Sequence, residues 1–117
     1  MKDNIVKERS FEFALKIIRL YQHLIAVKKE FTLSKQLLRS GTAIGALIRE
    51  AEQAESKADF IHKLSISLKE ANETKYCIEL LFRSDYINEA EYNSIILPLS
   101  ELLRLLTSII KTSKQVK

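Results

Sequence analysis

Apolar residues recur every three or four positions along four stretches of the chain, with polar residues between them. This spacing is typical of amphipathic α-helices, because side chains three and four positions apart share one helix face. The breaks between the stretches are short, so neighbouring helices should run antiparallel. We therefore predict one all-α domain, an antiparallel up-down-up-down four-helix bundle. The predicted helices span residues 10–27, 32–55, 57–83 and 88–112.

Capping signals mark the beginning of the last two helices. Ser56 and Asp59 form a Ser-x-x-Asp pattern that resembles a capping box. Asn88, followed three residues later by Glu91, has the same spacing before the fourth helix. Pro98 lies inside that fourth helix and should kink it or split it in two.

The helices differ in how much of their circumference is apolar. On a helical wheel, the apolar residues of 32–55 and of 57–83 fill an arc of roughly 120°, about what one bundle core requires. Those of 10–27 and 88–112 cover roughly 180° or more. Such a surplus would expose a patch that soluble monomers rarely tolerate.

We predict that this surplus is buried against other copies of the chain, so that the bundle is a homo-oligomer. The alternative is a thick monomer core that uses the extra width. The candidate interface residues are Phe11, Leu15, Ile18, Ile25, Ile96, Leu99, Leu103 and Ile110.

Two glycines, Gly41 and Gly45, lie four residues apart within the predicted helix 32–55, and the chain has no others. Each costs roughly 1 kcal/mol relative to Ala in a helix interior. They lie at the margin of the apolar arc, so we predict that they let a neighbouring helix or a bulky ring come close. A phosphate-binding loop is excluded, because it needs a preceding strand and a Gly-Lys-Ser/Thr ending.

Charge is spread unevenly along the chain, whose formal net charge is +4. Residues 1–49 contain 10 basic and 4 acidic residues, residues 50–101 contain 5 and 11, and residues 102–117 contain 4 and none. This layout can direct self-assembly or favour a polyanion at one face, and the simpler interpretation is solvated helix faces. The candidate nucleic-acid-binding residues are Lys28, Lys29, Lys35, Arg39 and Arg49.

Catalytic and metal-binding patterns are missing from the sequence. Asp59 and His62 have the spacing of one half of a di-iron motif, but His23 has no carboxylate three positions before it to supply the other half. Cys77, the single cysteine, has no adjacent histidine or basic residue to stabilise a thiolate. We therefore predict a protein that is not an enzyme and that has no cofactor or metal site.

The sequence also bears on location. The single cysteine fits a reducing cytoplasm, and the mixed-charge start MKDNIVKERS does not resemble a signal peptide. The longest unbroken apolar run, counting glycine, is AIGALI, which is far shorter than the roughly 18 residues that a membrane span needs. We expect a cytoplasmic protein without membrane contact.

Residues 39–81 read RSGTAIGALIREAEQAESKADFIHKLSISLKEANETKYCIELL. This segment strongly resembles the four-helix-bundle family named for 23S rRNA intervening sequences, also called S23-like. The likeness lies in the Ser-Gly-Thr-x-Ile-Gly-Ala run, in Glu-Ser-Lys-Ala-Asp-Phe and in Leu-Lys-Glu-Ala-Asn-Glu-Thr, and it extends to the turn SDYINEAEY.

The resemblance implies a left-handed up-down-up-down bundle that assembles into a homopentameric ring. It also implies kinship with the accessory protein of diversity-generating retroelements, a basic pentamer that is thought to engage nucleic acid and a reverse transcriptase. The family supplies no catalytic residues. We therefore expect a non-enzymatic scaffold or accessory factor associated with RNA or DNA; the alternative is a protein-binding adaptor without nucleic-acid contact.

Overall fold

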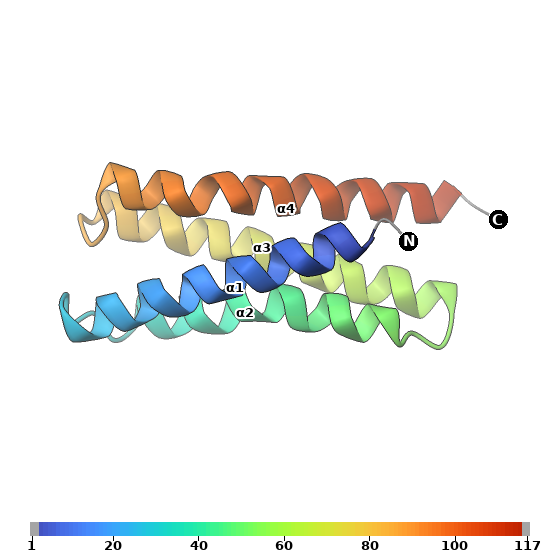
Figure 1. Ribbon diagram of the computed structural model, residues 1–117, viewed down its shortest axis with the longest axis horizontal. Coiled ribbons are helices and arrows are strands. Elements are labelled where there is room, and N and C mark those ends of the chain that lie inside the picture. The colour runs from blue at the N-terminus through green and yellow to red at the C-terminus, as the bar shows by residue number, and fades with distance from the viewer. Residues whose placement is uncertain (1–2, 116–117) are drawn as a thin grey trace.

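The computed structural model describes residues 3–115, with side chains from residue 5 onward. Four helices make up this part of the chain: α1 (Asp3–Ala26), α2 (Leu33–Glu52), α3 (Lys57–Arg83) and α4 (Glu89–Gln115). They form a rod of 50 × 21 × 19 Å, and the chain runs back and forth along its long axis (Figure 1). No strand occurs within residues 3–115, so the all-α prediction is confirmed.

Contacts between α2 and α3 show that these two helices are antiparallel. Near the middle of α2, the Ser40 hydroxyl accepts a hydrogen bond from the Thr74 hydroxyl at 2.9 Å. At the start of α2, the backbone carbonyl of Leu33 accepts one from the Cys77 thiol at 3.4 Å. The residue number therefore falls along α2 as it rises along α3. The small side chains at these contacts let the two helices pack closely.

The hydrophobic core fills the space between all four helices. Each helix supplies one row of side chains at helical spacing, as the apolar pattern predicts. The largest side chains that are almost completely buried are Phe13, Ile17, Leu24, Leu37, Ile44, Ile48, Leu64, Ile78, Leu81, Leu99, Leu102 and Leu106.

Helix α1 begins at Asp3 and not at Ser10, where the expected helix starts. Val6 is buried and extends the core row of α1 by about two turns beyond Phe13. The Ser10 hydroxyl donates to the carbonyl of Lys7 at 2.9 Å, inside the helix. The sequence concealed these two extra turns because charged residues outnumber apolar ones there.

Helix α2 ends at Glu52, earlier than the predicted residue 55, because the start of α3 organises the turn. The Ser56 hydroxyl accepts a hydrogen bond from the N–H of Asp59 at 3.0 Å, which confirms the capping prediction. The Asp59 carboxylate in turn accepts one from the N–H of Glu55 at 3.3 Å. These bonds hold residues 53–56 outside both helices.

Helix α4 continues to Gln115, past the predicted residue 112, and Pro98 does not split it. At its start, the Asn88 side chain accepts a hydrogen bond from the N–H of Glu91, and the Glu91 carboxylate accepts one from the N–H of Asn88, both at 2.8 Å. This reciprocal pair is the predicted capping box.

A buried carboxylate organises the start of α2. The side chain of Glu30 accepts hydrogen bonds from the backbone N–H groups of Thr32, Leu33 and Ser34 at 3.3, 3.0 and 2.7 Å. Burial raises the pKa of Glu30, but these donors outweigh it, and the net pKa is lowered. Thr32 itself makes no side-chain cap. Glu30 therefore caps the start of α2, a role that Ser, Thr, Asp or Asn usually has.

The two glycines mark a close approach of α1 to α2. A Cβ placed on Gly41 would lie 2.9 Å from both γ-carbons of Ile17, and one on Gly45 would lie 3.2 Å from the Ser10 hydroxyl oxygen. Neither glycine has a positive φ, so the need is for space and not for backbone freedom. The predicted role of the glycines is confirmed.

Candidate functional site

A row of apolar residues on α1 lies outside the core. It consists of Phe11, Leu15, Ile18 and Ile25, and we call it the outer stripe. Phe11 and Leu15 are 52% and 38% exposed, and Ile18 and Ile25 are half-buried. Their spacings of four, three and seven residues match the heptad repeat of helices that pack against another helix.

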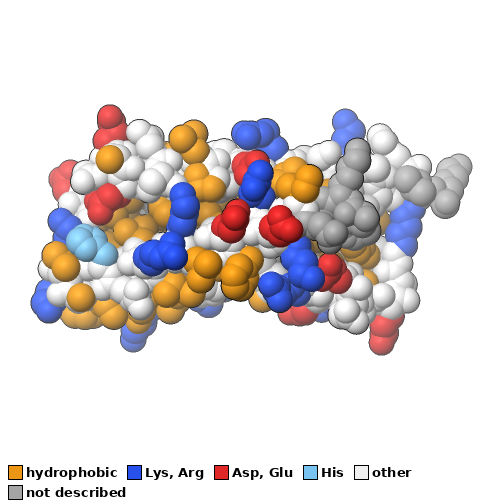
Figure 2. Space-filling view, in the orientation of Figure 1, with side chains coloured by type: hydrophobic (Ala, Val, Ile, Leu, Met, Phe, Trp, Pro, Cys, Tyr) orange, Lys and Arg blue, Asp and Glu red, His pale blue; other side chains and the backbone are white. Residues whose placement is uncertain are grey.

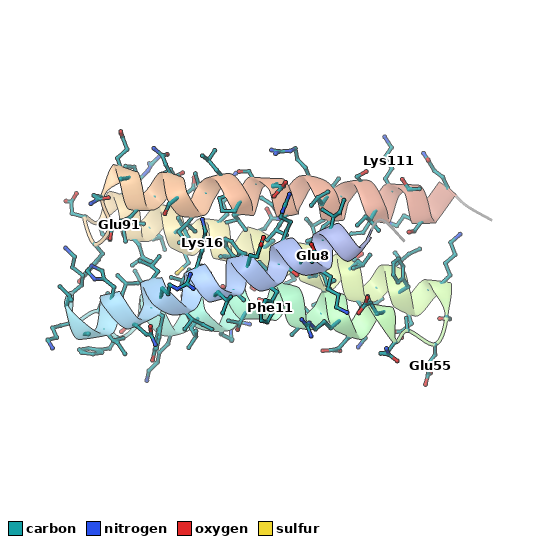
Figure 3. The ribbon with its side chains drawn as sticks, viewed as in Figure 1. Glu8, Phe11, Lys16, Glu55, Glu91 and Lys111 are labelled. Carbon is teal, nitrogen blue, oxygen red and sulfur yellow. The ribbon has the colours of Figure 1, made fainter. Side chains whose placement is uncertain are left out.

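The outer stripe follows the edge of α1 that adjoins α2. Phe11 projects toward α2 in Figure 3, and the Arg49 guanidinium lies over its ring, 5.3 Å from the centroid. Figure 2 shows hydrophobic side chains gathered in the centre and lower left of the molecule, over α1 and α2. Within residues 5–115, none of the four stripe residues belongs to the core or packs against it. The stripe is therefore an unpartnered surface.

The predicted interface on α4 needs correction. Leu99 is fully buried and Ile110 is 8% exposed, so the bundle's own core already uses both side chains. Ile96 and Leu103 are half-buried and pack against that core. On α4 the extra apolar width fills the seams with the neighbouring helices, which is the thick-core alternative. A helical wheel measures the width of an apolar arc, but it cannot show how deeply neighbouring helices cover it.

A groove of about 420 Å³ lies between α2 and α3, on a different face from the outer stripe. The Arg39 guanidinium forms its polar wall, paired with Glu70 at 3.1 Å and with Glu73 at 3.4 Å. The Glu70 and Glu73 carboxylates raise the pKa of Arg39, Glu70 more strongly. A hydrogen bond with Glu70, followed by the Arg39 interaction, lowers the pKa of Glu73. We call this the α2–α3 groove.

The rim of the α2–α3 groove is apolar and its floor is inert. Tyr76 and Leu80, 65% and 37% exposed, stand at the rim. The Cys77 thiol lies at the floor, where burial and then the negative charge of Glu30 raise its pKa to about 11. A thiol with so high a pKa is a poor nucleophile at neutral pH. The groove is suited to contact and not to covalent chemistry.

The five candidate nucleic-acid-binding residues do not form one patch. Lys28, Lys29 and Lys35 are exposed at the end of the bundle where α1 meets α2. The Arg39 guanidinium already forms ion pairs with Glu70 and Glu73. Arg49 lies against Phe11, about 21 Å from Lys35 along α2 at 1.5 Å per residue. The structure therefore places the three lysines at one end of the bundle and the two arginines farther along α2.

Two further results concern metal and membrane. Among the residues whose side chains are described, no three histidine, cysteine or acidic side chains come close enough to hold a metal ion. Helix α4 is long and apolar enough to cross a membrane by length and composition alone. That criterion is weak evidence, because core helices also meet it, and Leu99, Leu102 and Leu106 of α4 are buried within the bundle.

Comparison with known proteins gives a family and a fold, but no activity. Residues 2–108 match the model of a family described as 23S rRNA-intervening sequence protein. A crystal structure from Bacteroides thetaiotaomicron, described as a protein with unknown function from the S23 ribosomal protein family, is 60% identical. The match covers 95% of this chain and 99% of that one, with a TM-score of 0.93. No curated protein matches the chain.

Proposed function

This chain belongs to the 23S rRNA-intervening sequence protein family, and from that premise we propose that it acts as a non-enzymatic, self-associating scaffold. The copies assemble through the outer stripe of α1 into a homo-oligomer, with the pentamer that the family resemblance implies as the expected size. The assembly works as an accessory factor that contacts RNA or DNA in the cytoplasm, with a reverse transcriptase as a further candidate partner.

The observation that supports self-association is the outer stripe. Its heptad spacing suits packing against a helix, and its exposed side chains include Phe11 and Leu15. Covering them with another copy would remove apolar area from water, which is favourable by about 25 cal/mol per Å². Every copy of the chain carries the same exposed stripe, so another copy is always available as a partner. An exposed stripe of this kind therefore favours self-association.

Nucleic-acid contact has weaker support, from Lys28, Lys29 and Lys35. Three lysines on one monomer bind phosphates weakly and without sequence preference. An oligomer repeats the cluster, and simultaneous contacts raise the apparent affinity without any new interaction. The nucleic-acid role therefore depends on assembly, whereas assembly does not depend on nucleic acid.

Light scattering on the purified chain tests self-association. We expect an oligomeric mass for the natural sequence and a monomeric mass for Leu15→Glu, because a charge cannot be buried in the stripe. Leu97→Glu is the matched control, since Leu97 is 68% exposed on α4, outside the stripe. A natural chain that stays monomeric at all concentrations would overturn the proposal and favour the adaptor alternative.

A gel-shift series with mixed RNA and DNA at increasing salt tests the polyanion contact. Binding should weaken as salt rises, because phosphate contacts release counterions. Replacing Lys28, Lys29 and Lys35 with Glu should abolish it, whereas the same changes at Lys57, Lys111 and Lys114 should have a smaller effect. Absence of any shift at low salt would remove nucleic acid from the proposal.

A further inference from the structure

Resting on the proposed self-association, we propose that the outer stripe of one copy docks into the α2–α3 groove of the next copy. The two surfaces lie on different faces of the bundle and both present exposed apolar side chains, Leu15 on the stripe and Tyr76 at the groove. A contact between two different surfaces is heterologous, so each copy uses both and the assembly can close into a ring.

The two surfaces lie at matching heights, where height means position along the long axis of the bundle. Ile17 of α1 touches Gly41 of α2, and the neighbouring Ser40 bonds to Thr74 of α3. Residues 17 and 74 therefore lie at nearly the same height, and α1 and α3 run in the same direction. From these reference points, Arg19 falls level with Tyr76.

Apolar residues at the two surfaces also meet at this register. Ile25 on the stripe lies within about 3 Å of the height of Leu80, at 1.5 Å per residue. In a ring whose axis runs along the bundles, neighbouring copies sit at equal height. The stripe can thus reach the rim of the groove without sliding along it.

One pair of opposite charges is available between the two surfaces, although Arg39 and Lys69 also line the groove. Arg19 flanks the stripe, is exposed, and makes no ion pair with any side chain of residues 5–115. Glu73 at the groove has a side chain that is 46% exposed, although it already contacts Arg39. Their heights differ by about 4.5 Å, which these two long side chains can span. The carboxylate of one copy and the guanidinium of the next can therefore pair, which fixes the register of the contact.

The proposed contact also orients α2. This helix borders both surfaces, because the outer stripe adjoins it on one side and the groove on the other. A ring closed through two faces that share α2 turns this helix toward the ring axis. Lys35, which is exposed on α2, is then repeated around the axis. This arrangement brings one Lys35 from each copy toward a common axis.

A charge exchange tests the register. Arg19→Glu and Glu73→Lys should each weaken assembly by roughly tenfold in concentration, and the double variant should recover most of the loss. Arg104→Glu and Glu55→Lys are matched controls, since both residues are exposed outside the two surfaces. Sedimentation over a concentration series gives the assembly midpoint, and circular dichroism verifies that each variant is folded. Single variants that assemble like the natural chain would overturn the groove proposal.

Cysteine pairing distinguishes a heterologous contact from one stripe against another. In a Cys77→Ser background, copies with Ile25→Cys are mixed with copies that carry Leu80→Cys and are then oxidised. A mixed disulfide should form, and neither population alone should crosslink. Crosslinking of the Ile25→Cys copies with themselves would instead show stripe against stripe, leaving self-association intact and the groove proposal wrong. A monomeric natural chain would defeat both proposals, so the two failures can be told apart.

Discussion

The ammonium group of Lys16 on α1 donates a hydrogen bond to the backbone carbonyl of Ser94 on α4, at 3.3 Å. In a regular helix this carbonyl would accept from the N–H four residues later, and that residue is Pro98, which has no N–H. A side chain from another helix thus satisfies the acceptor that the proline leaves free; Figure 3 labels Lys16 on α1. This bond helps α4 to continue through Pro98 as one helix.

Removing the donor should show this coupling. Lys16→Met should lower the free energy of unfolding by about 1 kcal/mol, the usual net value of one hydrogen bond. In a Pro98→Ala background the helix supplies its own N–H, so Lys16→Met should then cost much less. Urea denaturation of the four proteins in this cycle measures the difference. Equal costs in both backgrounds would mean that Lys16 acts independently of the proline.

Replacing Gly41 or Gly45 with alanine should have opposite effects on the stability of the folded protein. Both changes gain roughly 1 kcal/mol of helix propensity. At Gly41 the new Cβ would overlap both γ-carbons of the fully buried Ile17, and such overpacking costs about 1 to 3 kcal/mol. At Gly45 it would lie 3.2 Å from the Ser10 hydroxyl oxygen, which is tighter than usual, and at an ordinary 3.5 Å from the Cβ and carbonyl oxygen of Ser10, so a shift of a few tenths of an ångström relieves it. Thermal denaturation should therefore show a lower melting temperature for Gly41→Ala than for Gly45→Ala, and the reverse order would contradict the packing argument.

The packing of α1, α2 and α4 shows which contacts the sequence can predict and which it cannot. The close approach at Gly41 was predictable, because two costly glycines at helical spacing need a steric reason. The fate of Leu99 and Ile110 was not, since their burial depends on how far neighbouring helices wrap around α4. The stripe at Phe11 has the same apolar pattern but lacks a covering helix. Periodicity along one helix gives faces, and only the packed bundle decides which faces stay exposed.

Glu30 was missed for a different reason. Capping rules favour short polar side chains, so attention falls on Thr32, while a glutamate two residues earlier resembles a surface charge. Only the fold bends the chain so that this carboxylate meets three N–H groups of the first turn. The α2–α3 groove was missed likewise, because Arg39, Glu70 and Glu73 are far apart in sequence and the antiparallel register brings them together.

Stability should depend on pH through Glu30. Its pKa is lower in the folded protein than its ordinary value of 4.5, so the unfolded chain binds the proton more readily. The stabilisation is therefore fully present above about pH 4.5 and is lost as pH falls through the lower, folded-state pKa. Glu30→Gln should be less stable than the natural chain at pH 7, and this difference should shrink at pH 3. Glu73→Gln is the control, because the pKa of Glu73 is also lowered but its side chain is half-exposed. A stability difference that stays constant between pH 7 and pH 3 would show that the Glu30 charge is not what holds the start of α2.

Cys77 should react with thiol reagents only when the bundle opens. Its side chain is 5% exposed, its thiol donates to the Leu33 carbonyl, and its pKa is raised to about 11. At pH 7.5 the labelling rate of the folded protein should be orders of magnitude below that of the urea-unfolded chain, and it should rise with urea as opening becomes more frequent.

Glu30→Gln removes the negative charge that adds to the effect of burial on the pKa of Cys77, and it also weakens the cap of α2. Native labelling should therefore become faster in that variant, whereas Lys111→Gln, a change far from the groove, should leave it unchanged. Rapid labelling of the folded natural chain would show that the thiol is accessible, and the floor of the groove could then no longer be treated as inert.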